Sequence, residues 1–119
     1  MSTGLSPEKQ SAWLVCGDQV LASLEIARTR KDRGMGLIGR TSLHGAFMIR
    51  PCKGVHTFGV KFPIDVVFCN NSMEIIDQIS MKPNRVGLLR LRSACVIESQ
   101  AGSVEKWGIR VGDVLEVRQ

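Results

Sequence analysis

Aromatic and histidine residues are scarce in this 119-residue chain, which has no tyrosine, four phenylalanines, two tryptophans and two histidines. Proteins that bind single-stranded nucleic acids stack the bases on aromatic side chains, so base stacking is not expected here. A structural zinc site needs four ligands, and the most suggestive pair, Cys52 and His56, supplies only two. The sequence therefore predicts neither a bound metal nor a cofactor.

Long apolar runs and paired cysteine motifs are also missing. No segment approaches the ~20 apolar residues that a membrane-spanning helix needs. The opening segment, MSTGLSPEKQ, lacks the apolar centre of a secretory signal. The four cysteines form no CxxC pair, and without a signal they are expected to be reduced, buried thiols. We therefore expect a cytoplasmic protein without a membrane partner.

The length limits the architecture. A chain of 119 residues is expected to form one domain, and a barrel of eight strand–helix units is excluded because it needs about 250 residues. Hydrophobic residues make up 44% of the chain and charged residues 23%, which is typical of a folded globular protein rather than a disordered one. We expect a loose tail over residues 1–11 and a single β-rich domain over residues 12–119.

Strand patterns dominate this domain. Residues 19–27 alternate apolar and polar side chains, as a half-buried strand does, and the preceding Gly17-Asp18 is a two-residue hairpin turn. Residues 64–69 are apolar except for Asp65, which is typical of a strand covered on both faces. Strands are expected at 13–16, 19–27, 46–49, 64–69, 73–81, 86–92, 94–99 and 114–118, and short helices at 29–38, capped by Thr29, and at 103–107. The predicted fold class is mainly β, a compact antiparallel sandwich or barrel with one or two short helices.

The net charge of +5 is concentrated in two segments. Residues 28–53 contain seven basic side chains and one acidic side chain, a sum of +6, and residues 82–92 contain four basic side chains and none that is acidic, a sum of +4. Clustered positive charge indicates an anionic partner, although a solvated surface gives the same pattern. On the expected strand at 86–92, the alternation predicts leucines facing the core and Arg90 and Arg92 facing the solvent.

Glycines at positions 34, 36 and 39 match the G-x-G-x-x-G spacing of dinucleotide-binding loops. Such glycines follow a strand and open a helix, whereas here the helix-like RTRKDR precedes them. They would then lie at the negative end of the helix dipole, which repels phosphate. We therefore interpret the glycines as a helix stop and a tight turn rather than as a nucleotide site.

The densest group of polar and aromatic residues is CKGVHTFGVKFPID, residues 52–65. Asp65 lies inside an apolar strand pattern, and a buried carboxylate needs a partner, which Arg40, Lys61 or His56 would supply. For Asp65 we favour a structural ion pair or a backbone cap. For His56 we favour a local hydrogen bond. In a shared pocket the two would form an acid–base pair, and His56 beside a cysteine would form a nucleophilic one.

Four motifs follow one another along the chain: DRGMGLIGR, TSLHGAFMIRP, VHTFGVKFPIDVVF and VIESQAGSVEKWGIRVGDVLEV. Together they resemble the prokaryotic family called domain of unknown function 192, over roughly residues 12–118. The resemblance implies a small, mainly β, sandwich-like domain with short helices and no established activity. Where many members have W-M-K-N-T, this chain has TFGVK preceded by His56. The family's recurrent polar residues correspond to Arg33, Arg40, Lys61 and Asp65.

Three functional hypotheses follow. The first is a noncatalytic binding module for a small anionic ligand or a protein partner, with a polar site formed by Arg33, Arg40, His56, Lys61 and Asp65. The second is a hydrolase or lyase that uses His56 with Asp65 or a cysteine. The third is nonspecific, salt-sensitive contact between nucleic-acid phosphates and the two basic segments, which the scarcity of aromatic residues disfavours.

Overall fold

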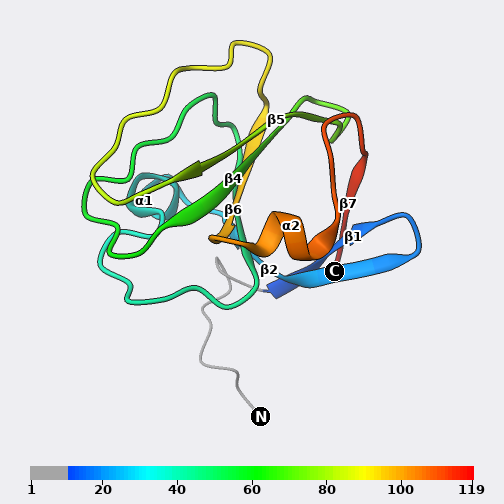
Figure 1. Ribbon diagram of the computed structural model, residues 1–119, viewed down its shortest axis with the longest axis horizontal. Helices are drawn as coiled ribbons and strands as arrows, with labels where there is room; N and C mark the ends of the chain where they lie inside the picture. The colour runs from blue at the N-terminus through cyan, green and yellow to red at the C-terminus, as the bar shows by residue number, and fades with distance from the viewer. Residues whose placement is uncertain (1–10) are drawn as a thin grey trace.

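The computed structural model describes residues 11–119 as a curled sheet with two short helices (Figure 1). The strands are β1 Ser11–Cys16, β2 Gln19–Ala27, β3 Ala46–Ile49, β4 Ile64–Cys69, β5 Ile75–Met81, β6 Cys95–Gln100 and β7 Leu115–Arg118, and the helices are α1 Arg30–Met35 and α2 Ser103–Trp107. The expected mainly β fold with short helices is confirmed. Residues 1–10 of the expected tail lie outside the described residues. Neither helix in the described part of the chain has the length and apolar character needed to cross a membrane.

The strands form a single sheet in the order β5-β4-β6-β3-β2-β1-β7. Neighbouring strands are antiparallel except β2 and β3, which run parallel. This pair departs from the expected antiparallel arrangement because the chain between β2 and β3 crosses over through α1 instead of turning back in a hairpin. An isolated bridge between Glu74 and Val114 joins the two edges of the sheet, which therefore curls into half of a barrel.

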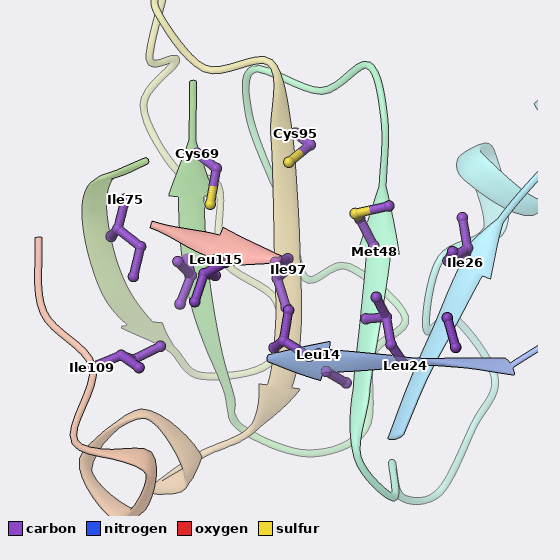
Figure 2. Close-up of a cluster of buried hydrophobic side chains, with 13 residues drawn as sticks. Leu14, Leu24, Ile26, Met48, Cys69, Ile75, Cys95, Ile97, Ile109 and Leu115 are labelled. Carbon is purple, nitrogen blue, oxygen red and sulfur yellow. The ribbon is translucent and has the colours of Figure 1, made fainter. Parts of the chain in front are cut away.

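Each face of the central strands is covered by its own hydrophobic cluster. The first cluster lies inside the curl and includes Leu14 and Ile97 (Figure 2). The second cluster, which includes Phe47 and Val66, lies on the opposite face, where the segments that follow α1 and β3 cover it. Alternate side chains of β4 enter the two clusters, so that both faces of this strand are covered. Its nearly continuous apolar run predicts this burial on both faces.

Thr29 caps α1 as predicted, because its Oγ1 accepts a hydrogen bond from the Asp32 amide at 3.0 Å. The helix ends at Met35, and so only the first turns of the segment 29–38 are helical. Gly36, which follows, adopts a φ of 50°, and its amide donates to the Asp32 carbonyl at 2.9 Å. A left-handed conformation of this kind favours glycine and stops the helix. Gly34 thus lies in the last turn of α1, and Gly36 and Gly39 follow its carbonyl end, which agrees with the interpretation of this cluster as a helix stop and a turn.

The prediction of a strand at residues 86–92 is wrong, because this segment is an irregular loop with one bridge, between His56 and Val86. The expected burial of the leucines is also wrong, whereas Arg92 is exposed as predicted. Leu89 and Leu91 face the solvent, with 68% and 77% of their surface exposed. An alternating pattern indicates two faces without identifying which face is buried.

Arg90 occupies the inward position that the leucines were expected to fill. Its guanidinium carbon lies 4.4 Å from the centre of the Phe68 ring, and its Nε donates to the Asp77 carboxylate at 2.9 Å. The aliphatic stem and the planar cation of arginine can cover an aromatic ring while the charge is paired. Arg90 therefore replaces an apolar side chain over the second cluster.

Candidate functional site

Two carboxyl groups lie in one row of side chains on the face of the sheet that the second cluster covers. Strand pairing places Phe47 of β3 between Glu25 of β2 and Glu98 of β6. On its other side Glu98 is paired with Val66 of β4. Directly paired residues share one face of a sheet, and Phe47 and Val66 belong to the second cluster. A phenyl ring therefore separates two carboxyl groups on the covered face of the sheet.

Arg40 lies over this row. Its Nη1 and Nη2 donate to the two carboxylate oxygens of Glu25 at 2.9 and 2.6 Å, and its guanidinium carbon lies 5.1 Å from the centre of the Phe47 ring. The hydrogen bonds to Glu25 raise the pKa of Arg40 above its ordinary value. Arg40 also acts on Glu98, because its positive charge favours the ionised form of that carboxyl group. Glu25 thus fixes a permanent cation beside Glu98.

Glu98 is the buried carboxyl group of the row, with 4% of its surface exposed. Within residues 12–119, no hydrogen bond or ion pair joins its side chain to another residue. Burial raises the pKa of Glu98 to about 7, against the opposing influence of Arg40. Near neutral pH the protonated and ionised forms of Glu98 are therefore present in comparable amounts.

Glu98 lines a cavity of about 200 Å³, here named the Glu98 cavity. Residues 33–38, at the end of α1 and in the glycine turn, contribute one part of its lining. Side chains between positions 52 and 60, together with Ile49 of β3, contribute the rest. The glycine turn that ends α1 therefore also forms part of the cavity wall.

The groups around the Glu98 cavity limit its chemistry. The Cys52 thiol donates to the Gly54 carbonyl at 3.1 Å. Burial raises the pKa of Cys52, and the nearby Glu98 raises it further, so this thiol stays protonated at neutral pH and is a poor nucleophile. Among the described residues, no group of three or more histidine, cysteine, aspartate or glutamate side chains is placed to share a metal ion.

The five side chains expected to form a ligand site do not share one place. Arg33 and His56 line the Glu98 cavity, where Arg33 is half-buried and His56 is exposed. Arg40 is paired with Glu25 and is not part of the lining, although its charge acts on Glu98. Lys61 is exposed and is also absent from the lining.

Asp65 lies on the other face of the sheet. Its Oδ1 accepts a hydrogen bond from the Ser80 hydroxyl at 2.7 Å, and its Oδ2 accepts from the amides of Gly102 and Val104 at 3.0 and 3.1 Å. Because Val66 points into the second cluster, its neighbour Asp65 points away from it. The structure therefore does not bring Asp65 to His56, and Asp65 instead ties β4 and β5 to the start of α2.

Sequence reasoning missed Glu98, the central group of the site. The signal is present, since Glu98 interrupts the apolar run CVIES just as Asp65 interrupts IDVVFC. A single acidic residue in a buried strand indicates a partner or a perturbed pKa. The proximity of Glu98 to Arg33 and His56 has no local signal, because it depends on how β6 pairs with β3 and β4.

Known proteins share this architecture. A protein of unknown function from Novosphingobium aromaticivorans has a crystal structure that matches with a TM-score of 0.75 at 22% identity, over 88% of this chain and 83% of that one. A proposed transcription regulator from Sinorhizobium meliloti matches with a TM-score of 0.77 at 19% identity, over 94% of this chain and 97% of that one. At these identities the likeness shows the fold alone.

Sequence relationships identify the family. The UPF0127 protein PF1050 of Pyrococcus furiosus is 26% identical over 105 residues, which cover 84% of this chain and 90% of that protein. The family model DUF192, uncharacterized ACR, matches residues 14–117. The resemblance carried by the four motifs is thus confirmed. The chain belongs to the DUF192 family.

Proposed function

We propose that this chain is a noncatalytic binding protein that holds a small anionic ligand in the Glu98 cavity. The observation that carries the proposal is the Glu98 carboxyl group, which is buried, has no protein partner within residues 12–119 and lines the cavity. A buried polar group needs a hydrogen-bond partner, and the protonated form of a carboxyl group needs an acceptor. An oxygen of an anionic ligand supplies that acceptor.

The lining suits a small organic acid. Arg33 supplies positive charge and His56 a further hydrogen-bonding group, and apolar side chains such as Ile49 and Val60 provide the walls. The volume of about 200 Å³ is smaller than the ~300–1,000 Å³ of sites for drug-sized ligands. A ligand with one carboxylate or phosphate group and a short apolar body therefore fits this site better than a nucleotide does.

Anion binding is expected to weaken roughly tenfold between pH 6 and pH 8. The protonated Glu98 donates a hydrogen bond to the anion, whereas the ionised form repels it, and its pKa of about 7 lies between these two pH values. Titrations of propionate, which remains a monoanion at both pH values, followed by NMR chemical shifts of residues 33–38, measure the effect. Glu98→Gln keeps a donor and removes the titration, so its affinity is expected to be nearly equal at both pH values.

Matched substitutions distinguish the cavity from general surface charge. Arg33→Met is expected to weaken binding at both pH values, whereas Lys61→Met removes an equal charge outside the cavity and is expected to change nothing. His56→Gln is expected to keep the tenfold dependence, which identifies Glu98 rather than His56 as its source. Equal losses for Arg33→Met and Lys61→Met, or no shift with propionate at millimolar concentration, contradict the proposed site.

A hydrolase or lyase is the alternative function. It is favoured by the placement of His56 in one cavity with Glu98, whose pKa of about 7 suits a general acid or base. Hydrolysis of p-nitrophenyl acetate by the wild-type chain, lost in Glu98→Gln and in His56→Gln, is the result that supports catalysis. Binding of propionate without turnover supports the noncatalytic function.

We also propose a cytoplasmic location. All four cysteines, Cys16, Cys52, Cys69 and Cys95, are free thiols. Cys69 and Cys95 are directly paired across β4 and β6, yet they form no disulfide. Four free thiols are typical of a reducing compartment.

A further inference from the structure

The loop of residues 82–92, here named the leucine loop, exposes several large apolar side chains to solvent. It runs from the end of β5 along the margin of the molecule, away from the β1–β2 hairpin (Figure 1). Four of its apolar side chains have 68–82% of their surface exposed: Val86, Leu88, Leu89 and Leu91. Single exposed apolar residues are ordinary, whereas several in one short loop indicate an interaction surface.

The leucine loop is held in place rather than loosely attached. Its backbone is bonded to the segment 53–57, with the Gly87 amide donating to the Val55 carbonyl at 2.9 Å and the Arg90 amide donating to the Lys53 carbonyl at 2.8 Å. The inward Arg90 anchors it further through Asp77. The leucines are therefore presented outward by a fixed backbone, and little conformational entropy remains to be lost when they are buried.

Basic side chains surround the exposed leucines. Lys82, Arg85 and Arg92 are exposed on the same loop, which contains no acidic residue. None of these three forms an ion pair within residues 12–119, whereas the nearby Asp77 is already paired with Arg90. The loop thus offers apolar tips flanked by unpaired positive charge.

We propose that the leucine loop binds peripherally to an anionic lipid surface. Leucine side chains enter the boundary between head groups and acyl chains, while lysine and arginine side chains contact anionic head groups. A second copy of the chain that docked through the same loop would bring three unpaired cations against three, and like charges repel. Nucleic acid would satisfy the cations but would leave the leucines uncovered, and the loop has no aromatic residue to stack on bases.

Peripheral binding to a lipid surface differs from membrane spanning, and the absence of a long apolar run in the sequence bears only on spanning. A spanning helix needs ~20 apolar residues, whereas peripheral binding needs only a few exposed apolar side chains and nearby positive charge. Alternation within 86–92 suggested that the leucines are buried, and so their availability to a bilayer became visible only in the folded chain.

Vesicle co-sedimentation of the full chain tests the proposal. We expect binding to phosphatidylglycerol-containing vesicles, little binding to pure phosphatidylcholine, and a decrease in binding as salt is raised. Replacing Leu88, Leu89 and Leu91 together with serine is expected to weaken partitioning at least thirtyfold, since even a leucine that is only partly buried contributes about threefold or more. Replacing Arg85 and Arg92 with glutamine is expected to weaken it roughly fivefold per charge.

Matched controls make the result decisive. Trp13 and Val20 are also exposed, with 54% and 56% of their surface accessible, but they lie on the β1–β2 hairpin, so Trp13→Ser with Val20→Ser is expected to leave vesicle binding unchanged. Circular dichroism verifies the fold of each variant. The proposal is overturned by absence of vesicle binding, by a leucine variant that binds like the wild type, or by a leucine-dependent dimer or RNA complex formed without vesicle binding.

Discussion

We expect the Glu98→Gln substitution to change the free energy of unfolding by about 3 kcal/mol more favourably at pH 8 than at pH 4.5. Burial raises the pKa of Glu98 from its ordinary 4.5 to about 7, so the folded state retains a proton that the unfolded state releases. The stability that this carboxyl group contributes is complete below pH 4.5, declines as the pH rises towards 7 and is constant above that. Glutamine has nearly the same shape and does not titrate, and so it removes this decline.

Urea unfolding of the wild type and of Glu98→Gln at pH 4.5, 6 and 8 measures the difference directly. Taking the difference between the two proteins cancels the titration of the other groups. Glu105→Gln is the matched control, because Glu105 is exposed on α2 and its substitution is expected to shift stability by less than about 0.5 kcal/mol at every pH. Parallel pH profiles for the wild type and Glu98→Gln contradict the raised pKa, and with it the protonated donor on which ligand binding rests.

Asp65→Ala is expected to cost about 3–5 kcal/mol of unfolding free energy while leaving anion binding intact in the folded protein. Asp65 accepts three hydrogen bonds, and removing its carboxylate leaves the Ser80 hydroxyl and the amides of Gly102 and Val104 without their acceptor. The loss combines three unsatisfied donors with the separation of β4 and β5 from the start of α2.

Ser80→Ala provides a graded comparison for Asp65. It removes one of the three hydrogen bonds and is expected to cost about 1–2 kcal/mol. Thermal unfolding ranks the two variants, and the propionate titrations measure binding in each folded protein. A stable Asp65→Ala protein that no longer binds propionate would contradict this prediction and would support the ligand-binding role expected for Asp65 from the sequence.

Local sequence signals account for the elements whose ends coincide with their predicted ends. The bounds of β2, β3, β4 and α2 are those expected, because short apolar runs and glycines or prolines mark them without help from distant residues. The helical start at Thr29 follows in the same way from its capping side chain. Such features depend on neighbours within a few positions, which the sequence displays directly.

The leucine loop shows where local reasoning fails. Residues 86–92 alternate like a strand, but Arg90 covers Phe68 of β4 and pairs with Asp77 of β5. Those partners decide which face is buried, and nothing in the seven residues themselves identifies them.

The sequence by itself determined a small, mainly β domain of the DUF192 family, with a capped helix that a glycine stops, and with two positively charged segments. Only the tertiary structure decided which polar residues meet. The parallel crossover between β2 and β3 aligns Glu25 with Phe47, and β6 then adds Glu98 to the same row. The five candidate residues were consequently divided, with Arg33 and His56 at the cavity and Asp65 on the opposite face. The physical reason is that strand pairing sets which residues share a face, and pairing between distant segments has no local signature.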